Sequence, residues 1–269
     1  MLWALIATFA LIFPNGAAFS NPESSPTYDS QAEQRLLELT NEERQKAGVP
    51  PLRLDPGLTE AARQHAALIA SKQELSHQFP GEPPLMQRLS KASSHLNDAG
   101  ENVAFDRDVD EAHGGLMHSP PHRRNLLNPK FNVVGFGAVR VGDTIYITED
   151  FGHKVQNYPV AEAENRVADA IARTRSSARG RRLRRMESGS LRRAACSMAN
   201  HDHLNPKTVS ALGGTHYVIT YTNLQPDSLP ANIQKPLKDD NVRSFAVGAC
   251  FAQSRSYPGG TYWVAVAFY

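Results

Sequence analysis

The stretch Ser119-Pro120-Pro121-His122-Arg123-Arg124-Asn125 decides the fold of this chain when it is read together with Ser76-His77 and Gly100-Glu101-Asn102. Each of the three lies at the end of a segment with apolar patterning, where a fold can gather polar side chains into a cleft. Two imidazoles and a carboxylate in one cleft can hold a divalent metal ion or transfer protons, which apolar side chains cannot do. We therefore predict that His77, Glu101 and His122 share one site.

The segments around these motifs have helical and strand-like patterns. We predict helices over residues 32–47, 57–74, 83–91 and 108–118, and strands over residues 101–105, 131–141 and 144–151. Asp55-Pro56 offers a helix cap followed by proline at the first helical position, and Gly142-Asp143 is a hairpin signal. Helices followed by an antiparallel strand pair, without a glycine-rich phosphate loop, indicate an α/β protein. We expect a three-layer α-β-α sandwich rather than a dinucleotide-binding fold.

Residues 1–20 have the pattern of a secretory signal peptide. Their apolar core is too short to span a bilayer, which takes about 20 residues, and small residues flank Phe19 at Ala18-Phe19-Ser20. No lysine or arginine precedes the core, so an uncleaved anchor is the alternative. Residues 21–31, rich in serine and proline, are predicted to form a tether. We expect an exported protein, secreted or held in the cell envelope.

The motifs resemble those of the CAP superfamily, which includes cysteine-rich secretory proteins, venom antigens, plant pathogenesis-related proteins and bacterial relatives. The resemblance covers residues 32–154, and the Ser-Pro-x-His-Arg form is similar to the bacterial branch. Besides the three stretches above, it rests on Leu39-Thr40-Asn41-Glu42-Glu43-Arg44, Val134-Gly135-Phe136-Gly137 and Glu149-Asp150-Phe151-Gly152. It implies the CAP fold, a three-layer α-β-α sandwich, for this part of the chain.

Family members with the full motif place two histidines and two glutamates around a central cleft, and the histidine pair can hold zinc or a related ion. The resemblance implies that His77 and His122 are these histidines and that Glu101 is the first glutamate. The second glutamate would fall near Ser119, so this chain departs from the pattern. Glu149, on the last predicted strand, is a candidate for the missing charge. Glu101 could instead orient one of the imidazole rings as a group outside the ligand set.

The other polar residues near the motifs are interpreted as structural. Asn102 and Asn125 are short amides suited to pairing turn backbone, and Ser119 is interpreted as the cap of the next helix. Three further histidines are interpreted as ordinary packing or exposed residues: His65, His113 and His118. No Gly-x-Ser-x-Gly elbow is present, and neither cysteine has a plausible catalytic neighbourhood. The sequence therefore contains no recognisable motif for a hydrolase nucleophile.

The second half of the chain echoes the first at a spacing of roughly 115 to 130 residues. The echo pairs Val247-Gly248-Ala249-Cys250-Phe251, Thr261 and Phe268 with Val134-Gly135-Phe136-Gly137-Ala138, Thr144 and Phe151. Residues 160–269 are therefore predicted to form a second, shortened CAP-like α/β unit. Val266-Ala267 takes the place of Glu149-Asp150 in this pairing, so we expect the second unit to lack the site chemistry.

Cys196 and Cys250 are the two cysteines of the chain. In an exported protein they can form a disulfide, and two buried free thiols are the alternative. Both belong to the predicted second unit, where a helix packed on a sheet can bring them within bonding distance.

The stretch from Arg173 to Arg193 contains nine arginines and one acidic residue, Glu187. This run suits contact with an anionic surface such as phospholipid or a cell-envelope polymer, and a solvated helix and loop is the alternative. Nucleic acid is not expected as a partner, because the chain carries an export signal and no aromatic residues interleave the arginines.

Two classes of function are open from the sequence. One is a binding module whose cleft holds zinc or another divalent metal, a small ligand or a peptide. The other is a metal-assisted hydrolase acting on peptide or cell-wall material. The missing second carboxylate favours binding, because it leaves no carboxylate committed to general-base work. We expect a monomer.

Overall fold

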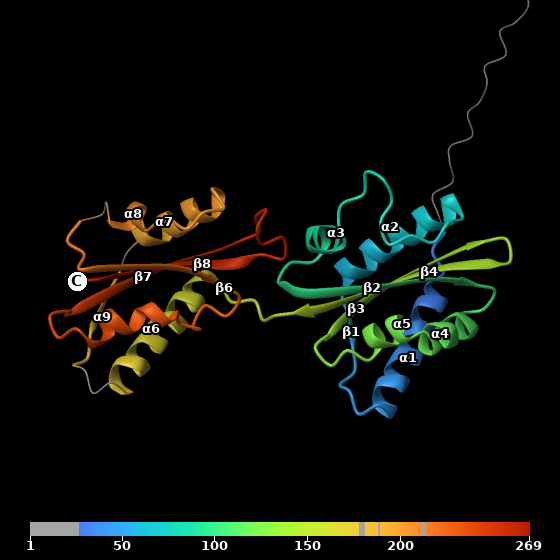
Figure 1. The fold of residues 1–269 in the computed structure, drawn as a ribbon, viewed down its shortest axis with the longest axis horizontal. Coiled ribbons are helices and arrows are strands. Elements are labelled where there is room, and N and C mark those ends of the chain that lie inside the picture. The colour runs from blue at the N-terminus through green and yellow to red at the C-terminus, as the bar shows by residue number, and fades with distance from the viewer. Residues whose placement is uncertain (1–26, 178–180, 188, 211–212) are drawn as a thin grey trace, which may run out of the picture.

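The structure, a computed structural model, describes residues 27–177, 181–187, 189–210 and 213–269. These residues form two α/β units in chain order, each built on its own four-stranded sheet (Figure 1). The predicted signal peptide, residues 1–20, lies outside the described residues. No helix in the described ranges is long and apolar enough to cross a membrane.

The predicted tether, residues 21–31, extends too far. Helix α1 (Ser30–Lys46) begins inside it, and the side chain of Asp29 caps this helix by accepting a hydrogen bond from the Ala32 amide. Tyr28 forms a β-bridge with Val139. The prediction was wrong at this end because a capping aspartate looks like linker composition until the helix that it caps is known.

The first sheet has the strand order β1-β3-β4-β2. Its strands are β1 (Arg53–Leu54), β2 (Leu96–Asp106), β3 (Val133–Val141) and β4 (Thr144–Lys154). Strand β1 runs parallel to β3, whereas the β3–β4 and β4–β2 pairs are antiparallel. Strand β2 is longer than the predicted 101–105 because it pairs with β4 over most of its length.

Helices cover both faces of this sheet (Figure 1). Helices α2 (Pro56–Lys72) and α3 (Leu85–Ala92) lie on one face, and α1, α4 (Val109–His118) and α5 (Pro120–Leu126) lie on the other. Asp55 caps α2 by accepting from the Leu58 amide, with Pro56 at the first helical position, as predicted. The predicted three-layer α-β-α sandwich is confirmed.

The second sheet repeats the order and the strand directions of the first. Its order is β5-β7-β8-β6, with strands β5 (Arg184–Met186), β6 (Tyr217–Asn223), β7 (Ser244–Ala252) and β8 (Thr261–Phe268). Strand β5 runs parallel to β7, and the other two pairs are antiparallel. The described helical segments of this unit are α6 (Val160–Ser177), α7 (Gly189–Asn200), α8 (Pro206–Ser210), the 3-10 turn η1 (Ala231–Ile233) and α9 (Gln234–Lys238).

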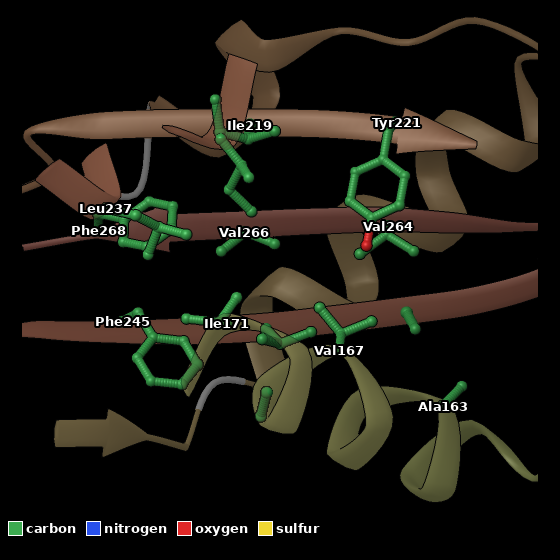
Figure 2. Packing of buried hydrophobic residues seen from close by; sticks show 14 of the residues in the cluster. Ala163, Val167, Ile171, Ile219, Tyr221, Leu237, Phe245, Val264, Val266 and Phe268 are labelled. Carbon is green, nitrogen blue, oxygen red and sulfur yellow. The ribbon is translucent and has the colours of Figure 1, made fainter. Parts of the chain in front are cut away.

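Helix α6 supplies one side of the core of the second unit. Figure 2 shows Val167 and Ile171 of α6 facing Val264 and Val266 of β8. On the other face, α7 packs on the sheet around the buried Trp263. Strand β8 is buried along its whole length, as expected of a strand that is covered on both faces.

Cys196 on α7 and Cys250 on β7 are joined in a disulfide, with a Sγ–Sγ distance of 2.13 Å and 5.1 Å between their Cα atoms. The prediction that they pair is therefore confirmed. The bond ties α7 to the sheet within the second unit.

The arginine-rich stretch is not a uniform cationic surface. Arg175 is buried, and it donates hydrogen bonds to the backbone carbonyls of Arg181, Leu237 and Asp239. Arg192 forms a bidentate pair with Glu164. The interpretation of the whole run as one contact surface was wrong for Arg175, because spacing along the chain does not show which side chains turn inward. Arg192 stays half exposed, with its charge paired to Glu164.

Candidate functional site

His77 and Glu101 meet where the loop after α2 crosses β2. His77 Nδ1 lies 2.9 Å from Glu101 Oε1. The side chain of His77 is 61% exposed, whereas that of Glu101 is 2% exposed. The hydrogen bond to Glu101 raises the pKa of His77, and partial burial opposes it. The imidazole is therefore anchored on one edge and presents its other edge toward solvent.

A largely buried group of charged side chains contacts Glu101 on the side away from His77 and fixes its position. Arg88, on α3, contacts Glu101 Oε2 and lies 3.1 Å from Glu82 Oε1. His65, on α2, lies 2.7 Å from Glu82 Oε1 through Nδ1 and 2.9 Å from the carbonyl oxygen of Ser76 through Nε2. Burial opposes ionisation of Glu82, but the Phe79 amide, His65 and Arg88 keep its pKa low. Glu101 is thus occupied on one oxygen by His77 and on the other by Arg88.

The sequence-based interpretation missed this buried group. His65 was predicted to be an ordinary histidine, and neither Arg88 nor Glu82 was singled out. A signal for His65 was present, because it falls on the same helical stripe as the buried Leu58, Ala62 and Ile69. A histidine on a buried stripe needs polar partners. Nothing comparable marked Arg88, whose helix has only eight residues.

His122 is anchored at its Nδ1 as well. This atom lies 2.8 Å from Ser119 Oγ. Ser119 is at the N-cap position of α5, as predicted, but its side chain makes no capping hydrogen bond. His122 is three residues after Ser119, so its ring lies one helical turn away and within reach of the hydroxyl. The Ser119 hydroxyl therefore holds the histidine ring and does not cap the helix. Burial and the neighbouring charge of His77 lower the pKa of His122.

Two asparagines, Asn102 and Asn125, join α5 to β2 through hydrogen bonds. Asn125 Nδ2 donates to the carbonyl oxygen of Glu101 at 3.1 Å and to Asn102 Oδ1 at 2.9 Å. Asn102 Nδ2 donates to the carbonyl oxygen of His122 at 3.2 Å and to Glu149 Oε2 at 2.9 Å. These contacts agree with the structural role predicted for both amides. They hold the helix of His122 against the strand of Glu101.

Glu149 and Asp150 place two more carboxyl groups in the interior. Glu149 pairs with Asn102 across the sheet, and Asp150 pairs with Glu101, so the two carboxyls lie on opposite faces. Burial raises the pKa of Glu149 to about 7. Burial and the nearby Glu101 raise the pKa of Asp150 well above its usual range. Glu149 is fully buried and bonded to Asn102, so it does not replace the missing second glutamate beside His77.

The arrangement contains two imidazoles, His77 and His122, that are each anchored through Nδ1. Within the described ranges, no group of three or more histidine, cysteine, aspartate and glutamate side chains is arranged to hold a metal ion. The Nε2 atoms of His77 and His122 have no hydrogen-bond partner among the described residues, while both Nδ1 atoms are bonded. An imidazole whose second nitrogen is fixed by a carboxylate or another polar group is the usual form of a metal ligand. Each ring therefore has the form of a metal ligand, and the two are near enough for the charge of His77 to contribute, after burial, to the lowered pKa of His122.

Residues 37–158 match the family model of the cysteine-rich secretory proteins, CAP, and the chain therefore contains a CAP domain. The uncharacterized protein YkwD of Bacillus subtilis is 35% identical over 120 residues, which is 44% of this chain and 47% of that relative. The chain thus spans less than half the length of this relative.

Two solved structures are similar to about half of the chain. An extracellular protein containing an SCP domain from Bacillus anthracis is 31% identical, with a TM-score of 0.43, covering 47% of this chain and 41% of that protein. NaASP2, crystallised with Zn²⁺, is 11% identical, with a TM-score of 0.35, covering 52% of this chain and 93% of that protein.

Proposed function

We propose that this chain is an exported binding protein whose His77 and His122 bind a divalent transition metal of the zinc type. The observation that supports this is that each ring is fixed through Nδ1, by Glu101 or by Ser119, and keeps its Nε2 without a partner among the described residues. With only two protein ligands, a bound ion would keep positions for a ligand from solvent. Zinc would supply a Lewis-acid centre to that ligand.

Glu101 orients His77 in this proposal and is not itself a ligand. Arg88 and His77 occupy its two oxygens, so the carboxylate has a compensated charge and a fixed position. This arrangement favours binding over metal-assisted hydrolysis, because a general base must be able to accept a proton from a bound water. Catalysis on peptide or cell-wall material is the alternative function, and the fixed Glu101 argues against it.

Export is supported by the residues themselves. The pattern of residues 1–20 is that of a secretory signal peptide. The disulfide between Cys196 and Cys250 is of a kind that persists in oxidising compartments and is rare in the cytosol.

Zinc titration of the purified protein by calorimetry tests the proposal. We expect one zinc per chain at pH 7.5, with binding that weakens as the pH falls, because protons compete for both imidazoles. The double variant His77→Ala/His122→Ala should lose this binding. His118→Ala is the matched control, since this exposed histidine on α4 bonds a backbone carbonyl. Zinc binding by the double variant equal to that of the parent protein would show that the proposed site is wrong.

A further inference from the structure

The turn between β7 and β8 lies next to the first unit (Figure 1) and contacts it. The ring of Phe251 stacks on His95, with the ring centroids 3.8 Å apart and the planes inclined by 9°. The His95 amide donates to the Gly259 carbonyl at 2.7 Å, and Gln253 Nε2 donates to the Ser90 carbonyl at 2.6 Å. The turn is therefore held against α3 and the start of β2.

A groove of about 800 Å³ lies between α3 and this turn. Pro83, Pro84 and Met86 line it from the first unit, and Pro258 lines it from the second. Its volume is in the range of ligand sites, which is about 300–1,000 Å³. Because hydrogen bonds and the ring stack fix both walls, the groove is a built feature of the two-unit chain.

The lining of the groove is positively charged. Lys91 lines it from α3 and Arg255 lines it from the turn, and no lining residue is acidic. Neither side chain forms an ion pair or a side-chain hydrogen bond within the described ranges. Asp202, outside the lining, is near enough to Arg255 to feel its charge: hydrogen bonds from Ser254 and Ser256 and the charge of Arg255 lower the pKa of Asp202. Its carboxylate forms no ion pair with Arg255 and accepts from Ser254 Oγ at 2.6 Å and from the Ser256 amide at 2.8 Å.

Ser90 gives a second, independent observation. This lining residue is 3% exposed, and its hydroxyl has no hydrogen-bond partner within the described part of the chain. Buried polar groups in native proteins are normally paired, and an unpaired one calls for a missing partner. Ser90 thus belongs to the lining of the groove and has a buried hydroxyl whose bonding capacity is unused.

We propose that this groove binds an extended acidic peptide. Two carboxylates would pair with Lys91 and Arg255, one on each wall, and apolar side chains would pack on the prolines and Met86. A free phosphate or sulfate would satisfy the cations and leave the apolar lining uncovered. A peptide that carries both acidic and apolar side chains satisfies both kinds of surface.

Fluorescence anisotropy with a labelled octapeptide of alternating leucine and aspartate tests this proposal. We expect saturable binding by the full chain, and at least tenfold weaker binding of the same peptide with asparagine in place of aspartate. Lys91→Glu/Arg255→Glu should weaken binding at least tenfold. The matched control, Lys130→Glu/Lys238→Glu, reverses two exposed lysines elsewhere and should change it less than twofold.

Further variants separate this groove from the histidine site. Gln87→Trp, at an exposed lining position, should obstruct the groove and weaken peptide binding, while circular dichroism stays that of the parent protein. His77→Ala/His122→Ala should bind the peptide as the parent does. Equal binding of the aspartate and asparagine peptides would overturn the proposal. Binding of phosphatidylglycerol vesicles through Lys91 and Arg255 without peptide binding would also overturn it, in favour of a lipid surface.

Discussion

The two units of this protein share a framework and differ at the site. Arg44 in the last turn of α1 is buried and donates to the backbone carbonyls of Leu126 and Asn128. Arg175 in the last turn of α6 is buried in the same way and donates to the carbonyls of Leu237 and Asp239. In both units a buried guanidinium thus ties the first helix to the end of a later, short helix.

In both units, a glycine of the sheet lies directly against a helix that covers the sheet. A Cβ on Gly135 would lie 2.0 Å from the Leu58 carbonyl carbon in α2, and one on Gly248 would lie 2.2 Å from the Leu191 carbonyl carbon in α7. Only glycine lets a helix approach the sheet this closely. These shared features, with the matching strand order, support the predicted repeat.

The glycines also give the register between the units. Gly135 lies opposite Asp150, and Gly248 lies opposite Ala265. The positions of Glu149 and Asp150 are therefore taken by Val264 and Ala265, two residues earlier than the predicted Val266-Ala267. Across the sheet, Glu101 and Asn102 correspond to Thr220 and Tyr221. The same backbone thus carries buried carboxyl groups in one unit and uncharged side chains in the other, so fold and site are separable.

The largest expected effect comes from removing Arg88. Arg88→Met leaves Glu82 and Glu101 buried without their guanidinium, and it should destabilise the first unit by about 3–5 kcal/mol. Urea denaturation measures this loss. Arg192→Met is the comparison in the second unit, where the arginine of the Glu164 pair is half exposed, and it should cost about 0–1 kcal/mol. Equal losses would mean that the two units do not differ in this respect.

The second-largest expected effect comes from removing the charge of the buried Glu149, whose counterpart in the second unit is Val264. Its pKa of about 7 lies above the usual 4.5, so the folded state binds more protons and stability falls as the pH rises from 4.5 to 7. Glu149→Gln keeps an acceptor for Asn102 and removes this loss. We expect a gain of about 3 kcal/mol at pH 8, at 1.36 kcal/mol per pKa unit, and little change at pH 4.

Urea denaturation at the two pH values checks this expectation. Glu74→Gln, at an exposed position of the same unit, should leave stability unchanged at both. A Glu149→Gln protein with the same pH dependence as the parent would show that Glu149 ionises without penalty.

The smallest effect concerns attachment to anionic surfaces, which we propose for the exposed arginines of the second unit only. Arg181, Arg182 and Arg184 are exposed, and each basic residue near an anionic membrane contributes about 1 kcal/mol. Charge reversal of all three should weaken binding to phosphatidylglycerol vesicles at least tenfold in a sedimentation assay. Reversal of Arg124 and Lys130 in the first unit is the control. Loss of binding with the control would assign attachment to the first unit.

Local patterns predicted the elements because the forces that form them are local. The Asp55-Pro56 cap started α2 as predicted, and Gly142 takes a left-handed conformation in the predicted hairpin. A cap or a tight turn depends on residues only a few positions apart, and their identities are in the sequence. The positions of His77 and His122 were predicted differently, from the resemblance of their motifs to those of CAP proteins.

The sequence by itself predicted the two α/β units, the disulfide partners as one of two alternatives, and His77, Glu101 and His122 as one candidate site. Only the tertiary structure decided that Arg88, Glu82 and His65 stand behind Glu101, that Ser119 holds His122, and that Glu149 lies on the other face. It also decided the register of the second unit and its docking against α3. The physical reason is that charge compensation depends on distance in space, and residues that neutralise one another need no fixed spacing along the chain.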